Sequence, residues 1–278
     1  KEDALDAADE LGEGEVVGTS AYAVTVIQTG TDRVLFQFDG GEDLALGIMP
    51  DVTGEDEVRT WFQGYKYHGG FRYERIGGGD LTVVNIVDLE TYIKGVVPYE
   101  MSSSWPLEAL KAQAVCARTY AVWQMQEYAY PEYEAHVDDS TSYQVYHKID
   151  SQTSTDQAVE ETVGQILLYQ KYPVKAYYFA TSCGVTTDEA IWEEGNTENS
   201  PYLCSRFVNE TTSEKDLTDE ETFAAWIRRK RAGDLEISEP WYRWNCEVPF
   251  TQIQKNVEKW MAVRLAKTGD GILIKDGE

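Results

Sequence analysis

One segment limits the fold of this chain more than any other. Residues 107–123 have apolar or small side chains on every side of the predicted helix, whereas a surface helix would carry a polar face. The segment therefore predicts a helix that is enclosed by the rest of the protein. A chain of 278 residues is long enough to supply the core that such a helix needs.

Two cations interrupt this enclosed helix. Lys111 and Arg118 are seven residues apart and so lie within roughly 20° of each other around it, at about 100° per residue. Cations on an enclosed helix require an anionic partner or a water-filled cleft. Three alternatives stay open: the pair lines a site, the side chains reach the surface, or Arg118 makes a purely structural salt bridge.

Glu100 is the nearest candidate anion, in an expected loop over residues 96–104. A carboxyl beside Tyr99, Met101 and Trp105 is partly desolvated, which favours the protonated form that a general acid needs, while a nearby arginine opposes this. The alternative is a surface charge or a helix cap, and spacing alone does not decide between them.

The first third of the chain has the pattern of β-hairpins. Residues 21–28 and 33–38 flank a turn, and residues 71–76 connect through three glycines to residues 81–87. The sequence predicts an α+β protein, with an acidic flexible leader over 1–15, a β-rich subdomain over 16–87 and a catalytic core over 88–278. We expect the subdomain to pack on this core of helices and strands.

Helix signals begin at Asp88, which can cap a short helix ending at Gly95. The enclosed helix follows from about Pro106. Three later helices are expected to open at Ser154, Thr218 and Thr251, each followed three residues on by Glu or Gln. A strand pair is expected over residues 164–169 and 173–180.

Composition excludes some partners. The formal net charge of −25 argues against non-specific binding to nucleic acid or anionic lipid, because these need clustered Lys and Arg. Eighteen Tyr and eight Trp are suited to stacking on sugars, so an uncharged or zwitterionic glycan is a suitable ligand. No run of about 18 apolar residues is present, and the acidic leader resembles what remains after removal of an N-terminal anchor.

The four cysteines lack the spacing of a zinc motif. They are either buried thiols or form a disulfide. If a disulfide forms, Cys183 and Cys204 are the first pair to consider.

A family resemblance bears on Glu100. Residues 83–123 read VVNIVDLETYIKGVVPYEMSSSWPLEALKAQAVCARTYAVW and closely resemble the signature of the stage II sporulation protein D (SpoIID/LytB) family; the stretch YQVY from Tyr143 and the block AYYFATSCGVTTDEAIWE from Ala176 continue it in order. The resemblance implies a lytic transglycosylase. Such an enzyme cuts the bond between N-acetylmuramic acid and N-acetylglucosamine in peptide-free peptidoglycan strands and leaves 1,6-anhydro ends.

The resemblance also implies site residues. Glu100 occupies the position of the family's essential glutamate, and Arg118 matches another active-site position. We expect Arg118 to hold Glu100 or a sugar oxygen. Further substrate contacts are expected from Lys111, Gln113, Tyr178, Thr181 and Ser182, although ordinary strand packing is the alternative for the last three.

Two departures from the family pattern matter. Some members bind zinc through a histidine and two cysteines, one of which directly precedes the Gln of the Gln-x-Tyr stretch. In this chain Tyr143 has that position. No metal or other cofactor is therefore expected. Val185 follows Gly184 where relatives more often have a second glycine, and valine does not readily adopt a positive φ. The local path around Ser182 is therefore expected to differ.

A non-enzymatic role is the main alternative, since related proteins are described as enhancers of a separate cell-wall amidase. The partners expected are glycan strands and an amidase or second wall hydrolase. We expect the protein to work outside the cytoplasmic membrane, facing the cell wall during sporulation and engulfment, and to be membrane-anchored in its full-length form.

Overall fold

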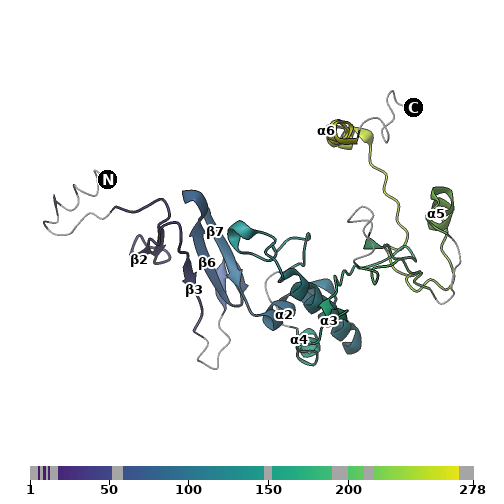
Figure 1. Cartoon of the computed structure of the whole chain (residues 1–278), viewed down its shortest axis with the longest axis horizontal. Helices are drawn as coiled ribbons and strands as arrows, with labels where there is room; N and C mark the ends of the chain where they lie inside the picture. Colours follow the sequence, from purple (N-terminus) through teal and green to yellow (C-terminus); the bar gives the residue numbers. More distant parts are fainter. Residues whose placement is uncertain are drawn as a thin grey trace. The chain divides into compact units, whose positions relative to one another are not determined.

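The computed structural model describes residues 6, 9, 10, 12, 18–51, 59–146, 152–189, 200–209 and 216–268. The chain divides into two compact units: residues 1–180 with 198–203, and residues 181–197 with 204–278. The described residues form helices and several small antiparallel sheets (Figure 1), which confirms the predicted α+β class.

The first unit begins with short strands. These are β1 (Val24–Ile27), β2 (Val34–Phe38), β3 (Leu46–Ile48), β4 (Thr60–Phe62), β5 (Tyr65–Tyr67), β6 (Gly70–Arg75) and β7 (Leu81–Ile86). β1 pairs with β2, β4 pairs with β5, and a three-stranded sheet has the order β3–β6–β7. Both predicted hairpins are confirmed. The second turns through η1 (Ile76–Gly78), where Gly77 and Gly78 have the positive φ that glycine adopts freely.

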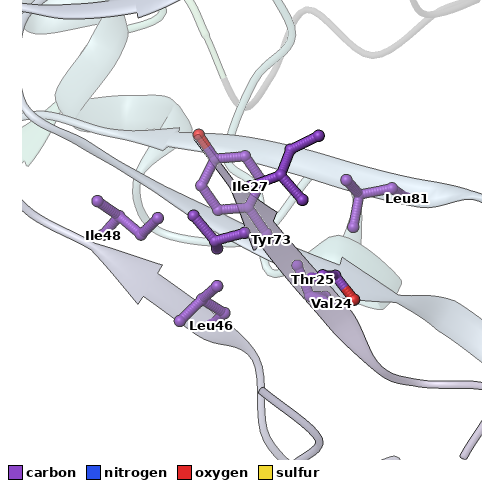
Figure 2. A pocket seen from close by; sticks show the side chains of 8 residues that line it. Val24, Thr25, Ile27, Leu46, Ile48, Tyr73 and Leu81 are labelled. Carbon is purple, nitrogen blue, oxygen red and sulfur yellow. The ribbon is translucent and has the colours of Figure 1, made fainter. Parts of the chain in front are cut away.

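A shallow apolar pocket of about 260 Å³ lies between β1 and the three-stranded sheet. Figure 2 shows its lining, which consists of Val24, Thr25, Val26, Ile27, Leu46, Ile48, Tyr73 and Leu81. Aliphatic side chains dominate this lining, and no carboxyl, imidazole or amine is among its groups. The pocket is therefore a packing groove of the β-rich region and is not suited to acid–base chemistry.

The helical part of this unit contains α2 (Leu89–Glu100), α3 (Leu107–Gln124), η2 (Pro131–Tyr133) and α4 (Thr153–Glu160), followed by β8 (Leu168–Tyr169) and β9 (Tyr172–Pro173). Its core combines aliphatic residues of α2 with alanines of α3; the members are Ile93, Val96, Val97, Ala114, Ala117, Ala121, Tyr146 and Val159. Small side chains on α3 let the neighbouring helices approach closely. The prediction of an enclosed central helix agrees with the burial of α3.

The predicted end of the first helix was wrong. α2 continues past Gly95 to Glu100 and includes Pro98 in its last turn. Val96 and Val97 are fully buried, so packing outweighs the local preference for a break. As a consequence, Glu100 is the last residue of a helix and is not a loop residue.

Two predicted capping boxes were also wrong. The Ser154 hydroxyl donates to the Ser103 carbonyl at 2.7 Å instead of capping α4. In α5 (Glu220–Ile227), the cap is Asp219, which accepts from the Thr222 N–H at 2.8 Å. The predicted strand pair shrinks to the two-residue strands β8 and β9.

The predicted cap of α2 is confirmed and provides a test. The Asp88 carboxylate accepts from the Thr91 N–H at 3.0 Å. We expect Asp88→Ala to lower the free energy of unfolding by about 1 kcal/mol, because one N–H of the first turn loses its partner. Urea unfolding measures the change, with exposed Asp80→Ala as the control. Equal stability of the two variants would contradict this role.

The second unit contains α5 and α6 (Phe250–Thr268), with Trp226 and Tyr242 among its buried side chains. Cys183, Cys204 and Cys246 of this unit and Cys116 of the first are all within the described ranges, and all are free thiols. The structure therefore does not contain the disulfide that was considered for Cys183 and Cys204. Of the helices that the structure describes, none is long and apolar enough to span a bilayer.

Candidate active site

Glu100 ends α2 and directs its carboxylate toward two hydrogen-bond donors. The Val145 N–H donates to Oε1 at 3.3 Å, and the Tyr178 hydroxyl donates to the same carboxylate. Burial raises the pKa of Glu100, while the bonds from Val145 and Tyr178 oppose the rise. The net pKa is above its ordinary value, which favours the protonated form that a general acid needs.

A buried amide sets the orientation of the Tyr178 hydroxyl. Gln144 is 1% exposed, and its Nε2 donates to the Tyr178 oxygen at 2.9 Å and to the Ala117 carbonyl at 3.2 Å. The Tyr92 hydroxyl donates to Gln144 Oε1 at 3.3 Å. Since a phenol has one proton and Gln144 already donates to its oxygen, the Tyr178 proton is directed at Glu100.

This hydrogen-bond relay, consisting of Tyr92, Gln144, Tyr178 and Glu100, joins α2 to two later segments. Burial raises the pKa of Tyr178 well above its usual range, so its hydroxyl stays protonated and remains a donor. Gln144 and Tyr92 were not among the site residues predicted from the sequence. The sequence did contain a signal for Gln144, because this residue lies in the YQVY stretch that carries the family resemblance. No sequence signal pointed to a role of Tyr92 in the site.

Arg118 is not brought to Glu100. Its fully buried guanidinium forms a bidentate ion pair with Glu90, at 2.9 Å from Nε to Oε1 and 2.7 Å from Nη2 to Oε2. Glu90 lies ten residues before Glu100 on α2, about 15 Å along the helix axis. Of the three alternatives that the sequence left open for Arg118, the structure therefore has the structural salt bridge.

Other bonds of Arg118 reach α4 and the segment that follows it, including the Thr162 hydroxyl at 3.4 Å. Its Nη1 donates to the Gln165 carbonyl and its Nη2 to the Val159 carbonyl, both at 3.2 Å. A guanidinium with 0% exposure has no surface for a bound sugar in this conformation. Arg118 is placed to position α2 relative to α3 and α4.

Residues 77–169, which carry Glu100, Gln144 and the Glu90–Arg118 pair, match a known family model, SpoIID, described as stage II sporulation protein. The chain contains a SpoIID domain. The predicted resemblance is confirmed.

Similarity to individual proteins agrees with this domain. An uncharacterised protein of Brachyspira hyodysenteriae is 45% identical over 50% of this chain and 37% of its own length. The stage II sporulation protein D of Bacillus subtilis is 38% identical over 44% of this chain and 39% of its own. The amidase enhancer of the same organism is 29% identical over 66% of this chain and 24% of its own. The chain thus spans less than two fifths of the length of these relatives.

Within the SpoIID domain, the structure separates the other two predicted residues of α3. Lys111 forms ion pairs with Glu108 at 2.7 Å and Glu161 at 2.6 Å, and hydrogen bonds to these two acids raise its pKa. Gln113 instead has a buried Nε2 without a hydrogen-bond partner among the described residues. Gln113 therefore has a donor that no described residue engages, whereas both acids already engage Lys111.

The other predicted residues lie beyond the matched region. Tyr178 joins the relay described above. Thr181 and Ser182 belong to the second unit, where the Ser182 hydroxyl donates to the Glu236 carboxylate and the Ser182 oxygen accepts from the Gly184 N–H at 3.0 Å. Within its own unit, Ser182 thus helps to fix a turn.

A groove of about 400 Å³ borders the end of α2. Its lining consists of Pro98, Tyr99, Ser102, Ser103 and Gln152, which includes neighbours of Glu100 on both sides in sequence. The Glu100 carboxylate is not part of the lining, because it turns toward Val145 and Tyr178. The groove offers hydroxyls and an exposed Tyr99 ring, both of which can contact a sugar.

Among the described residues, no group of three or more His, Cys, Asp or Glu side chains is placed to hold a metal ion. The His136 ring packs on Tyr128, with ring centroids 4.6 Å apart.

Proposed function

We propose that this protein is a lytic transglycosylase of peptide-free peptidoglycan strands and that Glu100 is its acid and base. The observation that carries the proposal is a partly buried carboxyl with a raised pKa inside the SpoIID domain, held by Val145 of that domain and by Tyr178 beyond it. The name of the Bacillus subtilis stage II sporulation protein D supports a place in sporulation. Peptidoglycan as the substrate rests on the resemblance in the sequence.

The proposed reaction needs one carboxyl group. Glu100 donates its proton to the glycosidic oxygen as the bond from that oxygen to the anomeric carbon of N-acetylmuramic acid breaks. The C6 hydroxyl of the same sugar attacks the anomeric carbon, and its proton passes to the Glu100 carboxylate. The products are a 1,6-anhydro end and a free N-acetylglucosamine hydroxyl, with Glu100 protonated again. Hydrolytic glycosidases require a second carboxylate because their nucleophile is not supplied by the sugar itself.

The hydrogen-bond relay has a role in both halves of this cycle. The Tyr178 hydroxyl stabilises the carboxylate that forms when Glu100 loses its proton, and Gln144 holds Tyr178 in that orientation. Gln113 and the groove beside Ser102 are the proposed substrate contacts of the first unit. Thr181 and Ser182 stay proposed substrate contacts from the second unit.

Tyr178→Phe provides a test of the relay. The Tyr178 bond lowers the pKa of Glu100, so its loss raises that pKa further. A general acid works when protonated, and the alkaline limb of kcat/KM against pH is therefore expected to move to higher pH. Tyr177→Phe is the matched control. An unshifted alkaline limb in Tyr178→Phe would contradict this coupling.

One comparison favours a second candidate function. The similarity to an amidase enhancer extends over 66% of this chain. In this alternative, the protein binds glycan strands and recruits an amidase without cutting. We also propose that the protein acts outside the cytoplasmic membrane, anchored to it in the full-length form, and cooperates with a second wall hydrolase during engulfment.

Purified protein alone, incubated with peptide-free strands, distinguishes the two functions. The transglycosylase is expected to release soluble saccharides without an amidase. Strand binding without release, together with faster hydrolysis by an added amidase, would favour the enhancer instead.

A further inference from the structure

A cluster of cations in the second unit takes no part in the proposed reaction. Arg228, Arg229, Lys230 and Arg231 follow α5 directly, and the Arg243 Nη2 donates to the Arg229 carbonyl at 3.3 Å. The pKa of Arg231 is lowered by burial first and also by repulsion from Arg243 and Arg229, with Asp234 opposing. Like charges are therefore concentrated here, although the whole chain has a net charge of −25.

Two N–H groups of this cluster lack acceptors. Arg231 Nη1 and Arg243 Nε are buried and have no hydrogen-bond partner among the described residues. Buried polar groups in proteins are nearly always hydrogen-bonded, so two unmatched arginine donors at one place require an explanation.

Nearby acids of the described part do not supply the missing acceptors. Asp234 accepts from the Tyr242 hydroxyl and, at 3.5 Å, from Asn209, and Glu236 accepts from Ser182. The ion pairs found among the described residues all lie in the first unit. Unlike Arg118, both Arg231 and Arg243 keep part of their surface exposed, so an external oxyanion can approach their positive charge and unmatched donors.

Aromatic rings hold these guanidinium groups. Arg231 stacks over Trp226, and Arg243 lies over Tyr242 at 4.0 Å from Cζ to the ring centroid. Stacking fixes the plane of a guanidinium. Arg243 Nη1 also donates to the Cys183 and Tyr242 carbonyls, at 2.9 and 2.8 Å, so Nε is the donor of Arg243 that stays unmatched. Trp241 and Trp244, on either side of the Tyr242–Arg243 pair in sequence, are 68% and 70% exposed. Exposed indole rings beside a fixed guanidinium suit a saccharide that carries a negative group.

We propose that Arg231 and Arg243 form a binding site for the carboxylate of an acidic glycan, with Trp241 and Trp244 contacting its sugar rings. The inference rests on the proposed function for the identity of the glycan, because peptide-free strands carry a free lactyl carboxylate on each N-acetylmuramic acid. It revises the expectation from net charge, since the local cluster is basic in an acidic chain.

Calorimetric titration tests the site in the full chain carrying Glu100→Gln, so that strands stay intact. The probes are peptide-free strands, the same strands with carboxyl groups reduced to alcohols, and poly(glycerol phosphate). Arg231→Gln is expected to weaken strand binding by about tenfold or more, because the loss of one charge-assisted hydrogen bond has an effect of about this size. Carboxyl reduction should cause a comparable loss, and exposed Arg206→Gln should cause none.

Three outcomes would overturn the site: unchanged binding by both Arg231→Gln and Arg243→Lys, equal binding of reduced strands, or preference for poly(glycerol phosphate). Arg231→Gln removes no hydrogen bond that the described structure contains, but it removes the stacking on buried Trp226. A thermal melt therefore separates a loss of binding from a loss of folding. This test is independent of the test of the proposed function. If the protein with intact Glu100 cuts no strands, the proposed function fails, but carboxylate-dependent binding can still be observed.

Discussion

Glu100→Gln is expected to lower the rate of strand cutting by about 10²- to 10⁴-fold, the contribution typical of a positioned acid–base group. Glutamine has nearly the same shape and can still accept hydrogen bonds from Val145 and Tyr178, but it cannot donate a proton to the glycosidic oxygen. Release of soluble saccharide from peptide-free strands measures the effect. Strand affinity should change little, because the loss concerns proton transfer.

Glu127→Gln is the matched control, since Glu127 is exposed just beyond α3 and should retain full activity. Equal activity of Glu100→Gln and the unmodified protein would exclude Glu100 as the acid. Loss of activity together with a lowered melting temperature would instead indicate damage to the fold.

The second large effect concerns stability. We expect Glu90→Ala to lower the free energy of unfolding by about 3–5 kcal/mol, because it leaves the Arg118 guanidinium buried without its counter-ion. The Arg118 side chain has no exposure, so its charge depends on the Glu90 carboxylate; Glu90 is 29% exposed, and water that enters at its position offsets only part of the loss. The Gly164 N–H, at 3.2 Å from Glu90 Oε1, also loses its acceptor. Urea unfolding measures the change.

An exposed ion pair of the same unit supplies the control. Lys94 and Glu160 lie 2.7 Å apart with side-chain exposures of 31% and 62%. Glu160→Ala is expected to cost at most about 1 kcal/mol, because exposed pairs contribute little. Similar losses in both variants would contradict a special structural role for the Glu90–Arg118 pair.

Local sequence signals predicted those parts of the fold that local interactions determine. The two hairpins follow from alternating apolar residues around glycine-containing turns, and Asp88 has the side chain that a cap requires. The end of α2 could not be predicted in this way, since Gly95 and Pro98 are local breakers and burial of Val96 and Val97 outweighs them.

The candidate site shows a similar division. Glu100 was identified through the resemblance, and its partial burial beside aromatic residues was expected. The partner of Arg118 could not be read from spacing, because Glu90 approaches it only when α2 packs on α3. Tyr92 and Gln144 are 52 residues apart, and their contact depends on the tertiary fold.

Mass spectrometry of the products from purified peptide-free strands tests whether Glu100 catalyses a transglycosylase reaction. The unmodified protein is expected to give 1,6-anhydro-N-acetylmuramic acid ends, and Glu100→Gln is expected to give none. Reducing ends in place of anhydro ends would contradict this expectation, because water would then be the nucleophile and a second carboxylate would be required.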